Sequence, residues 1–210
     1  MSSVPGTKGY SDVIDRFIEA TDAVDFFELH RAYVDLIPRE PGRVLDLGAG
    51  TGRDASVFAS MGHHVCAVEP MAEFRAAGAR LHASPRICWT DDSLPRLGSL
   101  VDVPAQFDFV LASGVWHHID EAERRVAMAR IFDLMKPGAV FALSLRNGPA
   151  GGGTHVFPTD AGQTAAMGTS LGFELVARLA DQPSLIKGKK DVRWSYLVFR
   201  RDGGRCGTMG

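Results

Sequence analysis

Short apolar runs alternate with helix-like stretches along most of the chain. The apolar runs lie at 44–47, 65–68, 87–89, 109–111 and 140–145. Between them, positions 53–61, 71–81 and 121–135 have the spacing of apolar residues that is typical of helices. A Gly/Pro-rich loop at 146–158 precedes a further helix and two more strands, near 174–179 and 194–199. Strands that alternate with helices predict right-handed crossovers and a mostly parallel sheet. The sequence Lys-Pro-Gly at 136–138 is expected to end the long helix and turn the chain into the next strand.

The first forty residues are predicted to be helical. Ser11 is placed to cap a helix whose apolar face comprises Val13, Ile14, Phe17 and Ile18. Asp25 and Glu28 have the spacing of a capping box, which predicts a second helix that ends before Pro38. We therefore expect a single α/β domain over 1–210. Its parts are a helical lid at about 11–37, a core at about 38–200 and a disordered tail at 201–210.

Composition and charge favour a globular protein that binds a small ligand. The 210 residues are 45% hydrophobic and 23% charged, with a formal net charge of −2, so no overall positive field attracts nucleic acid or an anionic membrane. The basic run Lys-Gly-Lys-Lys at 187–190 is interpreted as a solvated loop. Three scattered cysteines (Cys66, Cys88 and Cys206) predict reduced thiols rather than a disulfide framework. We see neither a signal-peptide pattern nor a membrane-spanning run, and we expect a cytoplasmic location.

Glycines at alternate positions follow the first apolar run. Gly48, Gly50 and Gly52 allow a tight turn with bare peptide groups, just before the helix that begins near Arg53. In an open parallel sheet, ligands bind beyond the carboxyl ends of the strands where the strand order reverses. The turn therefore predicts close approach by a ligand, although a strand-to-helix turn that needs glycine only for packing is the alternative.

Acidic residues end the next two strands. Glu69 follows the turn by about twenty residues, where a carboxylate can accept hydrogen bonds from the hydroxyls of a ribose. Asp91 and Asp92 end the third strand. Each acid alone can be a solvated loop residue, but together with the glycine turn they indicate a site for an adenosine-like group.

The turn disfavours two common nucleotide cofactors. A dinucleotide site needs a third small residue, and Arg53 occupies that position. The Lys and Ser/Thr of a phosphate-binding P-loop are also missing after the glycines. The remaining interpretation is a ligand without phosphates whose methionine-like end lies along the turn.

The segments VLDLGAGTGRDA, VEP, DDSLP, FDFVLASGVWHHI and MKPGAVFALSLR together resemble the motifs of the class I S-adenosylmethionine-dependent methyltransferases. The resemblance covers about positions 30 to 200. It implies a Rossmann-like, doubly wound, mostly parallel seven-stranded sheet, with helices on both faces and the final strand inserted antiparallel. It also implies S-adenosylmethionine as cofactor and S-adenosylhomocysteine as product. The cofactor contacts that it implies are Asp46, Gly48, Ala49, Gly50, Glu69, Pro70, Met71, Asp91, Asp92, Ser113 and Gly114.

Within that resemblance, Gly48 and Gly50 would line the methionine portion, and Asp46 would order the loop or face the amino group. Glu69 would hold the ribose and Met71 would pack on the adenine. Either Asp91 or Asp92 would meet the adenine amino group. Ser113 and Gly114 would flank the transferable methyl.

Candidate catalytic residues follow the fourth and fifth strands. His117 and His118 are candidates for a general base, although each can instead pack against or cap the next helix. Trp116 can stack on a flat acceptor or fill the core. Arg146 can hold an acidic substrate or pair with a neighbouring carboxylate. The seven histidines lack metal-ligand spacing, so no metal is predicted.

The acceptor is expected to be a small molecule methylated on an O, N or C atom. The fourth strand ends LASGVWHH, without the N-P-P-Y type run used for amino nitrogens or the Pro-Cys pair used for cytosine rings, and no nucleic-acid-reading module fits the length. The helices at 11–37 and the loop at 147–158 are predicted to cover the acceptor. Candidate lid residues are Tyr10, His30, Arg31 and Tyr33.

Two other functions remain open from the sequence. One is another enzyme of the same fold, such as an aminopropyl transferase or a dehydrogenase. The other is a non-catalytic protein that keeps the fold and regulates or scaffolds a partner. Acceptor identity is not specified by the residues, and both a monomer and a homodimer are compatible with them.

Overall fold

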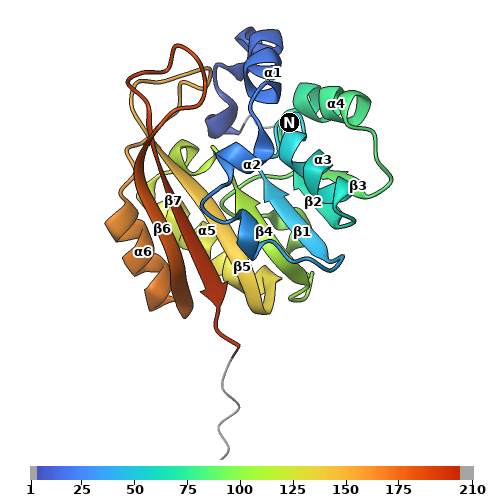
Figure 1. The fold of residues 1–210 in the computed structure, drawn as a ribbon, viewed down its shortest axis with the longest axis vertical. Coiled ribbons are helices and arrows are strands. Elements are labelled where there is room, and N and C mark those ends of the chain that lie inside the picture. Colours follow the sequence, from blue (N-terminus) through green and yellow to red (C-terminus); the bar gives the residue numbers. More distant parts are fainter. Residues whose placement is uncertain (1–3, 204–210) are drawn as a thin grey trace, which may run out of the picture.

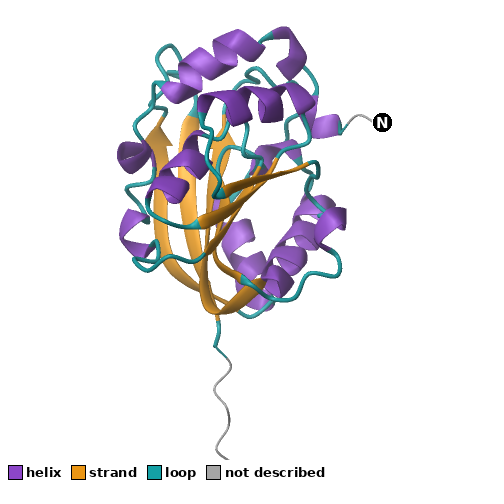
Figure 2. Ribbon diagram, turned by 90° about the vertical axis from the view of Figure 1, so that its right-hand side faces the viewer, coloured by secondary structure: helices purple, strands orange, loops and turns teal. Residues whose placement is uncertain are grey.

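The computed structural model describes residues 4–203, which contain a seven-stranded sheet with helices on both faces (Figures 1 and 2). Its strands are β1 (Arg43–Leu47), β2 (His64–Val68), β3 (Ile87–Thr90), β4 (Phe107–Ala112), β5 (Met135–Asn147), β6 (Phe173–Pro183) and β7 (Arg193–Arg201). They lie in the order β3-β2-β1-β4-β5-β7-β6, and β7 pairs antiparallel with both of its neighbours. The predicted topology, including the inserted antiparallel strand, is confirmed.

The central strands are buried on both faces because helices cover both sides of the sheet. Leu45 of β1 is paired with Val110 of β4, and all four residues Val44–Leu47 are buried. The apolar side chains form two core clusters. Cys66 on β2 and Cys88 on β3 are neighbours in register, and both are free thiols. Cys206 lies outside the described residues.

Four helices connect or flank the strands of the sheet. They are α3 (Arg53–Ser60), α4 (Ala72–Leu81), α5 (Glu121–Leu134) and α6 (Ala161–Ser170). A capping box begins α5, where Asp120 and Glu123 each accept a hydrogen bond from the other's backbone N–H. The long helix ends at Leu134, just before Lys-Pro-Gly at 136–138, as predicted. No separate turn follows, however, because α5 passes directly into β5 at Met135 and residues 136–138 belong to the strand.

The N-terminal segment is less helical than its apolar spacing predicts. It comprises α1 (Ile14–Asp22), α2 (Phe26–Leu29) and the 3-10 turns η1 (Pro5–Thr7), η2 (Tyr10–Asp12) and η3 (Val34–Leu36). Ser11 lies in η2 and caps nothing, because α1 begins after Val13 without a side-chain cap. Asp25 caps α2 as predicted, accepting from Glu28 N at 2.8 Å, but this helix ends at Leu29, well before Pro38.

Helix α1 lies above the end of the sheet at which the parallel strands terminate (Figure 1). The remaining 3-10 turns are η4 (Gly98–Leu100), after β3, and η5 (Trp116–His118), after β4. Among residues 4–203, no helix has the length and apolar character needed to cross a membrane. Of the predicted tail, Arg201 belongs to β7, and residues 204–210 lie outside the described range.

Candidate functional site

Two neighbouring cavities open at the carboxyl ends of the parallel strands. The smaller has a volume of about 110 Å³ and lies against β1 and β2, and the larger has a volume of about 480 Å³ and extends toward β5 and β7. Three residues line both cavities: Tyr10, Phe17 and Gly50. These residues mark the boundary at which a ligand in one cavity would meet a ligand in the other.

Gly50 and Gly48 of the glycine turn require glycine for different reasons. Gly50 has a φ of +55°, and a Cβ at this position would find only Phe17 Cε1, at 3.7 Å, so its bare backbone borders open space. Gly48 also has a positive φ, but a Cβ there would lie 2.8 Å from a methyl group of Val115. The close approach that the sequence predicts therefore applies to Gly50, whereas Gly48 is also needed for packing within the protein.

Glu69 is buried in the wall of the smaller cavity, with 5% of its surface exposed. Its Oε2 accepts a hydrogen bond from Gly50 N at 2.9 Å, and its Oε1 accepts one from Met71 N at 2.8 Å. Burial raises the pKa of Glu69 to about 7, because removal from water disfavours the charged form more than these two N–H groups favour it. The carboxylate thus joins the glycine turn to the end of β2.

The two aspartates after β3 have different surroundings. Asp92 lines the smaller cavity, and its Oδ2 accepts a hydrogen bond from Ser99 N at 2.8 Å. Asp91 is exposed, forms a 2.8 Å ion pair with Arg75, and is not part of the cavity wall. The structure therefore brings Asp92, rather than Asp91, together with Glu69.

Apolar side chains complete the smaller cavity. Pro70 and Met71 line it as the resemblance implies, and they are joined by residues that the sequence did not place in the site. These are Val4, Pro5, Phe17, Leu47, Val68, Phe74, Leu94, Val115 and Ile119. A flat, uncharged ring system suits such a wall. Phe17 had a detectable signal, since it lies on the predicted apolar face of the first helix, but only the tertiary structure turns that face toward Gly50.

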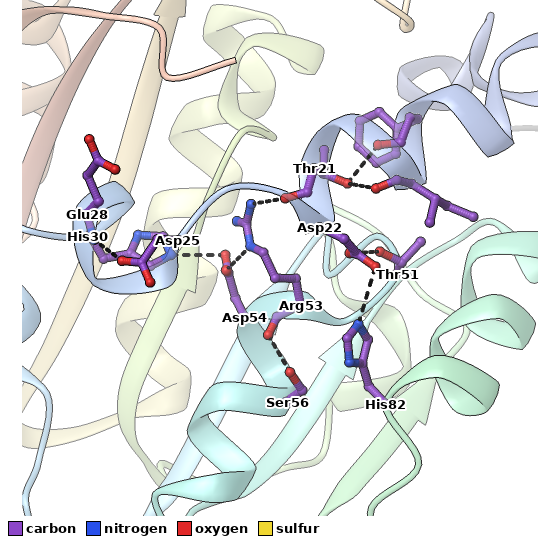
Figure 3. A network of polar contacts seen from close by, with 12 residues as sticks. Thr21, Asp22, Asp25, Glu28, His30, Thr51, Arg53, Asp54, Ser56 and His82 are labelled. Atoms are coloured by element: carbon purple, nitrogen blue, oxygen red, sulfur yellow. Dashed lines mark hydrogen bonds and ion pairs between the residues drawn. The ribbon is translucent and has the colours of Figure 1, made fainter. Parts of the chain in front are cut away.

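A polar network fastens the N-terminal helices to the start of α3 (Figure 3). Arg53 Nε donates to Asp54 Oδ1 at 2.7 Å, and its Nη1 donates to the carbonyl oxygen of Thr21 at 3.0 Å. His30 Nε2 lies 3.1 Å from Asp54 Oδ2. Burial alone would raise the pKa of Asp54, but the adjacent His30 and Arg53 bring it below its ordinary value. Arg53, which replaces the third small residue of a dinucleotide turn, thus anchors the N-terminal segment.

Asp46 lies beneath the turn and lines neither cavity. Burial raises its pKa well above the ordinary value, and the charge of Asp54 adds to the shift. Of the two roles open from the sequence, this position favours ordering of the loop over contact with a ligand.

His118 and Tyr10 meet at the boundary of the cavities. Tyr10 Oη lies 2.9 Å from His118 Nε2, and His118 Nδ1 lies 2.7 Å from the carbonyl oxygen of His155. Since a carbonyl only accepts, Nδ1 carries the proton and Nε2 accepts from the Tyr10 hydroxyl. Burial lowers the pKa of His118 and raises that of Tyr10 to about 12.

His117 faces the larger cavity instead, together with Ala49, Ser113, Gly114 and Arg146. Burial lowers the pKa of His117 to about 2, helped by the neighbouring His118. The sequence-predicted residues are thereby divided between two compartments. Trp116, in contrast, is fully buried in the core and faces neither cavity.

Parts of the N-terminal segment and of the Gly/Pro-rich loop, the two regions predicted to cover the acceptor, line the cavities. Residues 4–7 line the smaller cavity, α1 and Gly151–Gly153 line the larger one, and Thr154 N donates to Lys8 O at 2.9 Å. His30 and Tyr33 are wrong as lid candidates, because both are buried in the core where the Tyr33 hydroxyl contacts His30 Nδ1. Arg31 is at the surface, where it donates to Gln182.

The chain matches the sequence model of a protein family described as "Methyltransferase domain" over residues 18–203. It therefore belongs to this methyltransferase family. Uncharacterized methyltransferases of Bacillus cereus and Bacillus thuringiensis are each 25% identical to it over 146 residues. That alignment covers 63% of this chain, and the chain spans 63% of the length of these relatives.

Solved structures confirm the class I methyltransferase fold. A TehB-like SAM-dependent methyltransferase from Corynebacterium glutamicum superposes with a TM-score of 0.67 at 19% identity, covering 92% of this chain and 98% of that one. The 1,6-didemethyltoxoflavin-N1-methyltransferase of Burkholderia thailandensis, crystallised with 1,6-didemethyltoxoflavin and S-adenosylhomocysteine, has a TM-score of 0.65 at 21% identity. It covers 96% of this chain and 92% of that one.

Proposed function

We propose that this protein transfers a methyl group from S-adenosylmethionine to a small-molecule acceptor. The observation that carries the proposal is the boundary between the cavities. There the bare backbone of Gly50, held by the buried carboxylate of Glu69, borders both the smaller cavity and the larger one. The relatives and solved neighbours, which are named as methyltransferases, support the same activity.

The residues of the smaller cavity fit the nucleoside of such a cofactor. Glu69 would accept hydrogen bonds from the ribose hydroxyls, Met71 and Phe74 would pack on the adenine, and Asp92 would lie near its polar edge. The methionine portion would follow Gly50 and Ala49 toward Ser113 and Gly114, which line the larger cavity. When bound, S-adenosylmethionine supplies a methyl group that its sulfonium has already made electrophilic.

Positioning, rather than proton removal, is the chemistry that the protein's own residues are set up to provide. His117 faces the acceptor cavity, but a pKa of about 2 makes it a poor proton acceptor at neutral pH. His118 Nε2 is engaged by the Tyr10 hydroxyl. We therefore propose that His117 is a neutral wall of the acceptor cavity and that His118 positions Tyr10. Alignment of reacting groups can lower a barrier by roughly 7–11 kcal/mol in favourable cases.

Calorimetric titration with S-adenosylmethionine and S-adenosylhomocysteine tests the proposal. We expect both to bind, with one site per chain, and NAD not to bind. Absence of binding by the two sulfur nucleosides at high micromolar concentration would overturn the proposed function. Small-molecule extracts incubated with a methyl-labelled donor would then reveal the acceptor, and transfer of an aminopropyl group from the decarboxylated cofactor would instead support the alternative enzyme.

A further inference from the structure

The wall of the larger cavity carries a marked excess of positive charge. Arginine and lysine side chains from four separate segments line it, namely Arg16, Arg53, Arg146, Lys187 and Lys189. The lining contains one carboxylate among the described residues, that of Asp54. This carboxylate is already engaged, because it lies 2.7 Å from Arg53 Nε and 3.1 Å from His30 Nε2. The other four cations are therefore not balanced by the cavity wall.

Arg146 is the most buried of these cations. Its side chain begins at the end of β5, only 8% of its surface is exposed, and its guanidinium donates to the carbonyl oxygens of Gly148 and Pro149. Within residues 4–203, no carboxylate lies within 4 Å of it. Removing a charge from water is costly unless a group of opposite charge compensates for it. Burial accordingly lowers the pKa of Arg146.

Lys189 converges on the same place from the loop between β6 and β7. A Cβ built on Gly151 would lie 3.2 Å from Lys189 Nζ and 3.8 Å from Arg146 Nη2, so the two cations border the space above this glycine. Two positive charges that border the same space repel each other, and an anion between them would stabilise both. A side chain on Gly151 would crowd Lys189 Nζ, so glycine at this position lets Lys189 lie beside Arg146.

This cationic end of the cavity is separate from the residues assigned to the nucleoside. Arg146 is on β5, whereas Glu69 and the glycine turn follow β2 and β1, and β4 lies between β1 and β5 in the sheet. Neutral rings also line the larger cavity: His117 and Trp194 lie edge to face, with their centroids 6.2 Å apart, and Tyr196 is nearby. Arg16 on α1 and Arg53 at the start of α3 also line the larger cavity, on elements separate from those of Arg146 and Lys189.

We propose that the acceptor of this enzyme carries an anionic group, a carboxylate or a phosphate, which binds between Arg146 and Lys189. The uncharged remainder of the acceptor would lie against His117 and Trp194, directed toward Gly50. This inference rests on the proposed function, because it identifies the larger cavity as the acceptor site. It also gives a role to the basic run at 187–190, which the sequence alone presents as a solvated loop.

Binding of fragments to protein saturated with S-adenosylhomocysteine tests the proposal. The probes are benzoate, phenyl phosphate and the neutral benzyl alcohol, each titrated by calorimetry or ligand-observed NMR. We expect at least one anion to bind ten or more times tighter than benzyl alcohol, and the preferred anion distinguishes a carboxylate from a phosphate. Arg146→Gln and Lys189→Gln should each weaken that anion at least fivefold, while the affinity for S-adenosylhomocysteine changes less than twofold.

Lys190→Gln is the matched control, because Lys190 belongs to the same basic run but is exposed and does not line the cavity. Its effect on anion binding should stay below twofold. Equal binding of benzyl alcohol and both anions would overturn the proposal, and so would an equal loss in the Lys190 variant. Since Lys189 is in a loop, Lys189→Gln keeps the test valid if the Arg146 variant fails to fold.

Two further outcomes separate this inference from the proposed function. If wild-type protein fails to bind S-adenosylhomocysteine, the proposed function falls, and the inference falls with it. If Arg146→Gln and Lys189→Gln weaken S-adenosylhomocysteine but not 5′-methylthioadenosine, which lacks the amino-acid carboxylate, the cations serve the cofactor. In that case the inference is overturned while the methyltransferase assignment stands.

Discussion

The two cavities are built in different ways. Half of the residues that line the smaller one lie at or shortly after the ends of β1, β2 and β3, and Gly50, Glu69 and Asp92 each belong to a short motif visible in the chain. The larger one shares the glycine turn and the end of β4, but it also draws on α1, the end of β5, Gly151–Gly153 and the loop at 184–192. Segments that are far apart in sequence can change independently, whereas strand ends are held by the sheet. The comparison indicates that strand ends fix the proposed nucleoside site, whereas loops contribute most of what distinguishes the proposed acceptor site.

The sharpest test of this division is Gly50→Val, at the boundary of the cavities. A β-branched residue is strained at a φ of +55°, and its side chain would occupy the space that the turn leaves open. We expect the affinity for S-adenosylhomocysteine to fall at least about 100-fold, which corresponds to about 2.7 kcal/mol. Gly98→Ala is the control, since a Cβ at Gly98 meets no atom within 4 Å. Calorimetry measures the affinity, and unchanged binding by a folded Gly50→Val protein would contradict the assigned position of the cofactor.

Glu69→Gln should have the next largest effect. The carboxylate accepts hydrogen bonds from the glycine turn and faces the cavity, and a charge-assisted hydrogen bond contributes about 1.5–3 kcal/mol. The affinity for 5′-methylthioadenosine should therefore fall by about 10- to 150-fold. An effect below twofold would mean that the ribose does not lie at the end of β2.

Protonation of Glu69 should have opposite effects on the stability of the ligand-free protein and on its affinity for the nucleoside. Its pKa in the folded protein is about 7, above the ordinary value of 4.5. Its contribution to the stability of the ligand-free protein is therefore fully present below pH 4.5 and is lost as the pH rises through 7. The loss is of the order of 3 kcal/mol. Ribose hydroxyls favour the ionised form, so nucleoside affinity should rise over the interval in which stability falls.

Urea unfolding and 5′-methylthioadenosine titrations of wild type and Glu69→Gln at a series of pH values measure both effects. The difference between the two proteins isolates Glu69 from the histidines, whose depressed pKa values act in the opposite direction. Parallel pH profiles in the two proteins would show that Glu69 does not titrate in this range.

Asp92→Asn and Asp91→Asn compare two neighbouring acids that the sequence does not distinguish. Only Asp92 lines the smaller cavity, so its substitution should weaken 5′-methylthioadenosine by about five- to tenfold, the size expected for loss of one hydrogen bond. Asp91→Asn should leave the affinity within twofold, because its carboxylate is paired with Arg75 at the surface. The reverse ranking in calorimetry would reassign the adenine contact.

Tyr10→Phe is expected to have the smallest effect. The effect should be on the rate at which S-adenosylhomocysteine dissociates. The Tyr10 hydroxyl joins the N-terminal segment to His118 at the boundary of the two cavities. Loss of this hydrogen bond, worth about 1 kcal/mol, should speed dissociation of S-adenosylhomocysteine about fivefold in a stopped-flow competition experiment. Tyr33→Phe is the control, since it removes a core hydroxyl that contacts His30, away from both cavities. Equal dissociation rates in wild type and Tyr10→Phe would show that this contact does not hold the segment closed.

Elements with a strong local signal were predicted well from the sequence. Glycine follows β1 and β4 closely, at Gly48 and Gly114, and the helix predicted near 121–135 is α5, which Asp120 and Glu123 start through bonds that span only three residues. The N-terminal segment was predicted less well. Its apolar residues were assigned to two regular helices, but Phe26 and Tyr33 pack into the core while Phe17 faces Gly50. Periodicity alone does not show that one segment both packs into the core and lines a cavity.

The sequence by itself determined the strand–helix alternation, the glycine turn and the acids at the strand ends, because backbone geometry and short-range hydrogen bonds place these features within a few residues of each other. The tertiary structure alone decided three things. It placed Asp92, but not Asp91, in the wall of the smaller cavity. It directed His118 to the smaller cavity and His117 to the larger one. It also brought Lys189 to Arg146 across a gap of more than forty positions. Folding alone decides what surrounds a charged residue of a loop. For this reason a basic run that looks solvated in the chain contributes to the wall of a cavity in the protein.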